Sequence, residues 1–429
     1  MKLILRSYYL LFILFILLEN YFLLFSHKEG MGQTENSVLY FLVSLSIGVL
    51  IFARYYKKDI VSASATTANK KWNILVILLT VTGIILAGTE AWKVINQYPI
   101  DAHYSDIIPS IQVMVQRLLH GNEPVYAPIY DFGYLFSPTY LPMQWLPFTI
   151  AEVLHVDYRW IPFATWAITY FIVVFRTFRS DNLLLKLLVP IFFYLTYHYI
   201  NVQENNFIRC TVESMVIGYY ILLIISLNET SWLLWGTIIA ACLLSRFSLL
   251  LWLPLWAFAI FISGNRKDLY KSIGLVFVLT MLVYVIPFLS KDWHSFRAGY
   301  EHYNRATIGE WQNLNPMGEP NQLYAGTGFA HIFYHHFHQG DVPAQIALVK
   351  KVHFIVSLGV SMLMGVWYWY NRKKIDLRIF LIASFKIYLT FFLAFIQIPY
   401  VYLMTVGNFV SIAILAELMR YKVSPKPTY

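Results

Sequence analysis

The sequence predicts an all-α polytopic membrane protein with about twelve transmembrane helices, on three observations. Of its 429 residues, 58% are hydrophobic and only 13% are charged, whereas a soluble domain carries roughly a quarter charged residues. Apolar runs of about 20 residues, long enough to cross a bilayer as helices, recur along the chain. Basic residues concentrate in alternate connecting segments, as they do in cytoplasmic loops.

Twelve apolar runs give the predicted spans. The first follows MKLILR and lacks a small-residue cleavage site, so we expect an uncleaved helix rather than a signal peptide. The longest run, 233–262, contains Arg246, and we divide it there. The twelve runs lie at residues 7–25, 37–55, 73–91, 160–178, 183–200, 207–227, 231–244, 247–263, 272–289, 351–370, 377–396 and 399–419.

A further apolar run, 140–156, decides the topology. Its two prolines, with Gln144 and Glu152, suit a helix that lies on the outer face or dips into it. With that assignment and cytoplasmic termini, 20 of the 32 basic residues fall in inner segments. If the run crossed, the NRKK cluster at 371–374 would lie outside, against the positive-inside rule. We therefore expect a multi-pass inner-membrane protein whose polar loops and active site face the periplasm.

These assignments divide the chain into four parts and bring three polar regions to one side. These polar regions are the first external loop, the turn NVQENN at 201–206 and the second external loop. The parts are a two-span hairpin at 1–71, a core at 72–289 whose first external loop is 93–159, a second external loop at 290–350, and a three-span bundle at 351–429.

Composition also excludes several classes of function. The net charge of +9 is accounted for by topology-setting residues, so we predict no nucleic-acid partner. The short inner loops hold no glycine-rich phosphate loop, which argues against ATP or a cytosolic sugar nucleotide as substrate. Cys210 and Cys242 lie within apolar runs, and we expect buried side chains rather than a disulfide. We predict no cofactor.

Two aspartates follow the third span, and the second begins an amphipathic run. Apolar residues recur at helical spacing from Ile107 to Leu119. Asp106 is then either the N-cap of that helix or a general base that takes a proton from a hydroxyl acceptor. Asp101 competes for the base role, orients the loop, or binds a metal with Asp106, although this spacing is no recognisable metal signature. A phosphate leaving group would need nearby cations rather than a proton.

Several motifs carry a family resemblance. The pattern SDIIPSIQVMVQRLLHGNEPVY at 105–126 resembles the first external loop of GT-C glycosyltransferases, most closely the bacterial polyprenol-phosphate-mannose-dependent mannosyltransferase family. FSPTYLPMQWLPF at 136–148 is similar to that family's second surface helix and to the tyrosine- and proline-containing segment that precedes it. NVQENN resembles its Gly-Gln-x-Asn turn without the glycine, and NQLYAGTGF at 321–329 resembles an Asn- and Gln-rich segment of its late loop. Ser110 stands where the family usually has tyrosine, and the likeness covers roughly residues 73–345.

The resemblance implies a GT-C-like bundle that transfers mannose or a similar hexose, with inversion, from a polyprenyl-phosphate donor to a hydroxyl of a lipid or glycan acceptor. Asp106 matches the family's base. Arginine and histidine side chains would hold the donor phosphate, and aromatic rings would stack on sugar or prenyl chain, unless they serve as interfacial anchors. The expected substrate-binding residues are Arg159, Gln203, Asn205, Asn206, Arg246, Tyr126, Tyr140, Asn321, Gln322, His331 and His335.

Histidines and one buried acid leave alternatives. His331 and His335 are spaced i, i+4 within a cluster that continues to His338, but no Glu follows the first as in HExxH, so we predict no metal site. One of these histidines is expected to contact the donor phosphate or the acceptor. Glu213, about two turns below NVQENN, either lines the floor of the site or bonds to a neighbouring helix.

Three other functions stay open. A secondary transporter would have two related halves with interrupted helices and charges at mid-membrane, and the sequence has no internal repeat. A polysaccharide polymerase or ligase would depend on the late outer loop and lack an aspartate directly after an early span. A non-catalytic scaffold gives no reason for three polar regions on one side.

Overall fold

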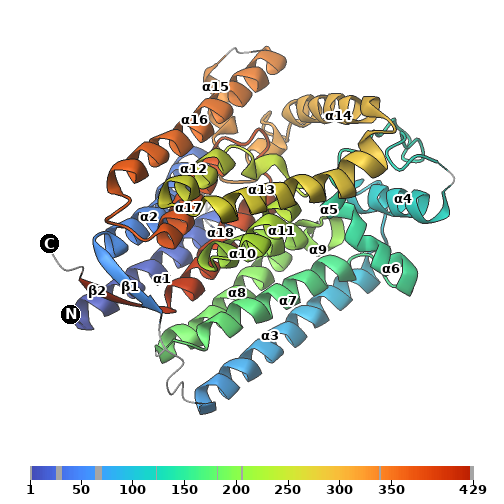
Figure 1. The fold of residues 1–429 in the computed structure, drawn as a ribbon. Coiled ribbons are helices and arrows are strands. Elements are labelled where there is room, and N and C mark those ends of the chain that lie inside the picture. The colour runs from blue at the N-terminus through green and yellow to red at the C-terminus, as the bar shows by residue number, and fades with distance from the viewer. Residues whose placement is uncertain are drawn as a thin grey trace.

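The chain folds as a helical bundle with one small sheet. The structure, a computed structural model, describes residues 2–25, 31–62, 70–121, 123–180, 182–203, 206–337 and 340–425. Within these ranges, eight helices are long and apolar enough to cross a membrane, and four shorter apolar helices pack among them (Figure 1). The all-α prediction is confirmed at this level, as is the architecture of a polytopic membrane protein.

The long helices mostly coincide with predicted apolar runs. Their bounds differ chiefly at α16 and α13, each of which begins before its predicted run. Helix α13 continues as the π-helix η3, which contains Pro287. They are α2 (Gln33–Tyr55), α3 (Lys70–Gln97), α7 (Trp160–Thr177), α8 (Leu183–Gln203), α13 (Arg266–Thr280) with η3 (Met281–Leu289), α16 (Val342–Asn371), α17 (Leu377–Ala394) and α18 (Val401–Leu418).

The remaining elements are of two kinds. The apolar ones are α1 (Lys2–Leu24), α10 (Glu213–Asn228), α11 (Trp232–Leu243) and α12 (Leu253–Ser263). The others are α4 (Ile107–His120), α5 (Pro142–Trp145), η1 (Leu146–Phe148), α6 (Thr149–Leu154), α9 (Asn206–Cys210), η2 (Phe247–Leu249), α14 (Trp293–Gln312), η4 (Asn321–Leu323), α15 (Ala330–His336) and the strands β1 (Lys58–Ser62) and β2 (Tyr421–Pro425).

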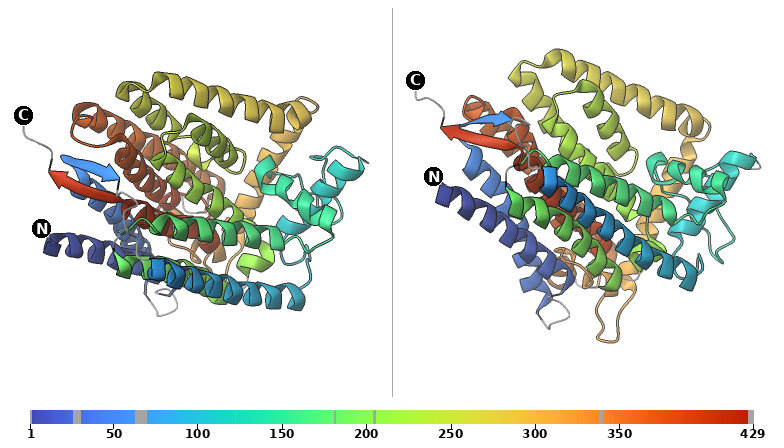
Figure 2. Two further views of the ribbon diagram at one scale, coloured as in Figure 1. Left: turned by 60° about the horizontal axis from the view of Figure 1, so that its bottom comes forward. Right: turned by 90° about the horizontal axis from the view of Figure 1, so that it is seen from below.

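Both chain ends lie at one end of the bundle, which we call the terminal end (Figures 1 and 2). There β1 pairs with β2 in antiparallel register, from Lys58 opposite Pro425 to Ser62 opposite Tyr421. The Arg176 guanidinium donates to Glu417 Oε1 at 2.5 Å and so joins α7 to α18. The helices α4–α6, α9 and α14 lie at the opposite end, which we call the loop end (Figures 1 and 2).

Helix α11 ends below the loop end of its neighbour α13. The Ser272 hydroxyl donates to the Trp232 carbonyl at 3.0 Å, which sets α11 and α13 at one level. From there α11 ends at Leu243, whereas α13 and η3 continue to Leu289. At 1.5 Å per residue, α11 stops roughly 9 Å short. This depth brings Arg246, in the turn after α11, below the level of the surface helices.

The apolar run 140–156 forms no single helix. It is divided into α5, η1 and α6, with Pro142 and Pro147 each at the start of a new helical segment, because proline lacks the N–H that continues a helix. The Met143 N–H donates to the Leu244 carbonyl at 2.9 Å, and Tyr219 of α10 donates to the Met143 carbonyl at 3.0 Å. The run therefore dips onto the short helices instead of crossing the bundle.

The N-terminal hairpin is bonded into the bundle rather than appended to it. The Lys386 ammonium of α17 lies 2.6 Å from Glu19 Oε1 of α1, and both side chains are almost fully buried. The Tyr40 hydroxyl of α2 donates to Asn408 Oδ1 at 2.9 Å. Buried charges are costly in an apolar bundle unless they are paired, so this pair fixes α1 against α17.

Candidate functional site

The first and second external loops meet at the loop end. On α14, the backbone at Gly299 packs so closely on the first loop that an added Cβ would lie 2.9 Å from the Pro138 carbonyl oxygen. The rings of Phe136 and His302 pack edge to face with centroids 4.7 Å apart. The Ser105 hydroxyl donates to the Cys210 carbonyl at 3.0 Å and ties the first loop to α9. Segments distant in the sequence thus surround the start of α4.

Helix α4 presents Asp106 at its start. Its apolar residues Ile108, Ile111 and Val115 are buried at helical spacing, and the helix ends at Gly121 in the left-handed region (φ 69°). The amphipathic prediction therefore holds for this segment. Asp106 itself is half-buried where the apolar face begins.

The Asp106 carboxylate does not cap its helix. The Ser105 hydroxyl instead accepts a hydrogen bond from the Ile107 N–H at 3.3 Å. Asp106 Oδ2 accepts a hydrogen bond from the Tyr134 hydroxyl at 2.9 Å. Tyr134 reaches back because Ile129 and Phe136 pair as a β-bridge whose turn contains Gly133 at φ 80°. The carboxylate is thus directed toward the loops, and Asp106 occupies the N-cap position of α4 without a capping bond from its side chain.

Four residues form what we call the Asp106 cluster: Asp106, Tyr134, Tyr140 and His302. Burial raises the pKa of Tyr134 and of Tyr140, and the Asp106 carboxylate raises both further. Burial lowers the pKa of His302, which Asp106 opposes and Arg305 reinforces. At neutral pH the carboxylate therefore faces protonated phenols and a neutral imidazole. Asp106 thus has hydrogen-bond donors beside it, and among the described residues it forms no ion pair.

Arg246 lies beneath this cluster. It forms an ion pair with Glu213, whose side chain is 1% exposed, so of the two expected roles for Glu213 the structure gives a bond to the turn after α11. Glu213 starts α10 because the helix breaks there: its N–H donates to the Thr211 hydroxyl at 3.3 Å. This break divides the predicted run 207–227 into α9 and α10.

Tyrosines connect the Asp106 cluster to Arg246. Tyr402 of α18 lies within electrostatic range of Tyr140 on one side and of Arg246 on the other. Glu310 of α14 accepts a hydrogen bond from the Tyr400 hydroxyl at 2.9 Å. Polar residues of the first loop, α14 and the start of α18 therefore lie near one another at the loop end.

Arg159 serves the scaffold rather than the site. It is 1% exposed, and its guanidinium donates to both carboxylate oxygens of Asp157 and to the carbonyls of Tyr98 (2.7 Å) and Ile95 (3.1 Å). These bonds satisfy the carbonyls at the end of α3 and hold that end against the start of α7. A guanidinium so occupied has no free face for a donor phosphate, and we leave it out of the site.

Tyr126 and Tyr140, both expected to bind substrate, have different surroundings in the structure. The Tyr126 hydroxyl donates to the Tyr140 carbonyl at 2.9 Å and accepts from the Trp145 indole at 3.1 Å. Its ring packs on Phe288 with centroids 5.7 Å apart, so Tyr126 anchors the loop on η3. Tyr140 faces Asp106 and stays in the candidate site.

The second-loop residues 321–335 lie against α2 and not at Asp106. Buried His331 shares a hydrogen bond with Thr34 (3.1 Å) and one with the Gly328 carbonyl (2.9 Å). Exposed His335 bonds to the Tyr324 hydroxyl. Asn321 and Gln322 are in η4, where the Asn321 N–H donates to the Asn313 carbonyl at 3.0 Å. Among the described residues no three potential ligands are grouped to hold a metal ion, and His338 lies outside them.

The turn NVQENN is only partly described. Asn205 lies outside the described residues, and for Gln203 and Asn206 the structure describes the helical backbone but not the side chains. Their predicted contacts with substrate stay predictions.

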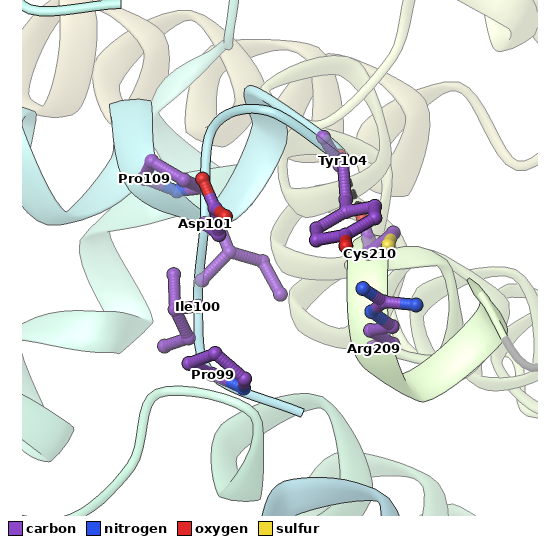
Figure 3. A pocket seen from close by; sticks show the side chains of 9 residues that line it. Pro99, Ile100, Asp101, Tyr104, Pro109, Arg209 and Cys210 are labelled. Atoms are coloured by element: carbon purple, nitrogen blue, oxygen red, sulfur yellow. Dashed lines mark hydrogen bonds between the residues drawn. The ribbon is translucent and has the colours of Figure 1, made fainter. Parts of the chain in front are cut away.

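Asp101 belongs to a second feature of the loop end, a small open pocket beside α4 (Figure 3). Asp101 is exposed, and its Oδ1 accepts from the His103 N–H at 2.9 Å. The Arg209 guanidinium carbon lies 4.3 Å from the Tyr98 ring centroid and 4.0 Å from that of Tyr104. Asp101, Tyr104, Ser105, Arg209 and Cys210 line the pocket, with Pro99, Ile100, Ile108 and Pro109. The two aspartates therefore face different surroundings.

Sequence reasoning missed His302 and Arg209, and it placed Tyr134 only among the aromatic residues that could stack on sugar or prenyl chain. The sequence does carry a signal for the position of Tyr134, because Gly133 precedes it in a turn-forming DFG. No local pattern distinguishes His302 or Arg209 from other polar residues of external loops. In comparisons with protein-family models and with curated proteins, the chain matches none.

Proposed function

We propose that the protein is an inverting membrane glycosyltransferase that moves a hexose from a polyprenyl-phosphate donor to a hydroxyl of a lipid or glycan acceptor. The observation that carries the proposal is the Asp106 carboxylate, which leaves capping to Ser105 and faces the Tyr134 hydroxyl where two loops meet. The GT-C-like bundle of twelve spans, the mannose donor and an outward-facing site are parts of the same proposal.

In the proposed reaction Asp106 takes the proton of the acceptor hydroxyl. The acceptor oxygen forms a bond to the anomeric carbon as the bond from that carbon to the phosphate oxygen breaks, and polyprenyl phosphate leaves with the electron pair. The phosphate needs no proton, because it is stable as an anion. Arginines near the cluster, Arg246 and Arg305, contribute the positive charge that favours departure. Neutral His302 can accept the proton from Asp106 and pass it to water.

Two features support this reaction class. The short helices α10–α12 leave room for polar residues at the level where a lipid headgroup meets the hydrocarbon. The terminal end collects the short basic loops, which agrees with an inside location for that end and an outer location for Asp106.

A polymerase or ligase of lipid-linked glycans is the second candidate. It is favoured by one observation, that α14 of the second external loop contributes His302 beside Asp106. Such an enzyme would release products with many sugar units, whereas the first proposal predicts the addition of single hexoses. Product length therefore distinguishes the two.

A transfer assay tests the proposal. The purified full chain is reconstituted in liposomes with radiolabelled polyprenyl-phosphate-mannose and a mixed lipid acceptor extract, and labelled product is separated by chromatography. Asp106→Asn is expected to lower the rate by about 100-fold or more. The matched control is Asp131→Asn, the same chemical change at an exposed position of the same loop, which should retain the rate within a few-fold. Full turnover by Asp106→Asn would refute the assignment of the base.

A further inference from the structure

Arg209 carries a charge that the described protein does not neutralise. Its guanidinium carbon lies over the Tyr98 ring and over the Tyr104 ring, 4.3 Å and 4.0 Å from their centroids, and such cation–π contacts stabilise a cation without neutralising its charge. Among the described residues no carboxylate lies within 4.0 Å of it, in contrast to the ion pairs of Arg159, Arg176 and Arg246. Its Nε is buried and has no hydrogen-bond partner in the described chain.

A buried donor of this kind is costly unless an acceptor reaches it. The pocket lined by Arg209, Tyr104 and Ser105 is where such an acceptor can enter (Figure 3). Guanidinium groups held in one plane match the geometry of phosphate oxygens. Arg246, one of the two arginines predicted from sequence, is the weaker anion site of the two, because it already shares its charge with Glu213.

The charge of Asp101 indicates which class of phosphate Arg209 would bind. Asp101 lines the same pocket as Arg209 (Figure 3), and the two form no ion pair in the described part of the chain. A phosphate monoester carries about −1.5 to −2 charges at pH 7, so a single guanidinium beside a carboxylate disfavours it. A phosphodiester carries a single negative charge and meets less repulsion. The lining also includes the apolar residues Ile100, Ile108 and Pro109, so the pocket suits an esterified phosphate better than a free one.

We propose that Arg209, held between Tyr98 and Tyr104, binds the phosphodiester group of a membrane lipid at the loop end. The lipid is either the glycosylated polyprenyl phosphate or an anionic phospholipid of the bilayer. Only the first of these sources rests on the proposed function.

Lipid binding in detergent tests the site without requiring turnover. The full chain, purified in a maltoside detergent that contains no phosphate, is titrated with polyprenyl-phosphate-mannose and, separately, with phosphatidylglycerol, and bound lipid is counted by native mass spectrometry. Polyprenol and diacylglycerol are the neutral controls. Arg209→Gln is expected to weaken at least one phosphodiester by about ten-fold or more and to leave both neutral lipids unchanged. The phosphodiester that is lost identifies the source.

Control variants separate binding from folding. Arg297→Gln removes an equal charge from exposed α14, where Arg297 pairs with Glu301, and should leave phosphodiester affinity within two-fold. Arg209→Lys keeps the charge but loses the planar donors, so it should fall between wild type and Arg209→Gln. Asp101→Asn should raise the affinity for polyprenyl monophosphate relative to polyprenyl-phosphate-mannose by a few-fold.

Two results would overturn the proposal. One is unchanged binding of both phosphodiesters by Arg209→Gln, and the other is an equal loss of neutral and charged lipids, which would mark Arg209 as a structural residue only. The outcome is independent of the transfer assay. If no sugar transfer occurs but Arg209→Gln loses phosphodiester binding, the lipid site stands and the proposed function falls. If transfer depends on Asp106 while Arg209→Gln binds both phosphodiesters normally, the proposed function stands and the lipid site at Arg209 falls.

Discussion

Arg246 in the turn after α11 forms an ion pair with Glu213 at the start of α10, and the Glu213 side chain is 1% exposed. Each partner holds the other in a place where a lone charge is unfavourable. The pair lies beneath the Asp106 cluster, within electrostatic range of Tyr402 and Tyr303. It therefore has two separable roles, one in stability and one in the charge of the site.

Variants of this pair separate the two roles. Arg246→Met leaves Glu213 buried without a partner and should destabilise the protein by about 3 kcal/mol or more, with loss of transfer. Adding Glu213→Gln removes the stranded charge and should restore most of the thermal stability but not the transfer rate. Unfolding temperature and sugar transfer are measured on the same preparations. Recovery of transfer in the double variant would show that Arg246 only neutralises Glu213.

Removing one partner of the buried Lys386–Glu19 ion pair should lower the free energy of unfolding strongly without acting directly on sugar transfer. Lys386→Met should cost about 3–5 kcal/mol, because Glu19 is left uncompensated, and Lys386→Met with Glu19→Leu should recover most of it. Chemical unfolding in detergent measures both. The control is Arg297→Ala at the exposed pair with Glu301, with an expected cost below about 1 kcal/mol. Equal costs for Lys386→Met and the control would contradict the buried pair.

The buried imidazole of His331 should make the folded protein less stable in acid. Burial lowers the pKa of His331 from 6.5 to about 4, with smaller contributions from His335 and His336 against a bond to Gly328. Between those values the unfolded chain binds a proton that the folded chain does not. The free energy of unfolding is therefore at its full value above about pH 6.5 and declines as the pH falls toward 4, by up to about 3 kcal/mol.

Unfolding temperatures across this range test the assignment to His331. The variant His331→Gln keeps an amide to bond the Gly328 carbonyl but does not titrate, so its unfolding temperature should vary less between pH 6.5 and 4 than that of the wild type. An identical pH dependence in the two proteins would assign the acid sensitivity to other groups.

The two ends of the bundle predict opposite accessibility in a sealed membrane. Met317 in the second external loop is 80% exposed, and Tyr370 at the terminal end of α16 is 77% exposed. A cysteine at Met317→Cys should react with a membrane-impermeant maleimide in intact cells or spheroplasts, whereas one at Tyr370→Cys should react only after the membrane is opened. Native Cys210 and Cys242 are buried and give little background. The opposite pattern would place the Asp106 cluster inside and refute the proposed topology.

Hydropathy and spacing located the long helices, the start of α4 at Asp106 and the dip at 140–156, because each depends on residues close together in the chain. The apolar spacing after Asp106 predicts the buried face of α4, and the prolines of 140–156 predict a break. The same local information predicted a continuous helix at 207–227, where the Thr211 hydroxyl takes the Glu213 N–H and the helix breaks instead.

The partners of individual polar side chains were decided by the tertiary structure alone. On sequence, Arg159 and Arg246 were equivalent outer arginines, yet one satisfies the end of α3 and the other pairs with Glu213 beneath the Asp106 cluster. Asp106 was expected either to cap α4 or to act as a base, and in the structure Ser105 accepts the Ile107 N–H while Tyr134 bonds to the Asp106 carboxylate. Charges and hydrogen-bond donors act on whichever groups the packed helices bring within a few ångströms, and hydropathy along the chain carries no record of that pairing.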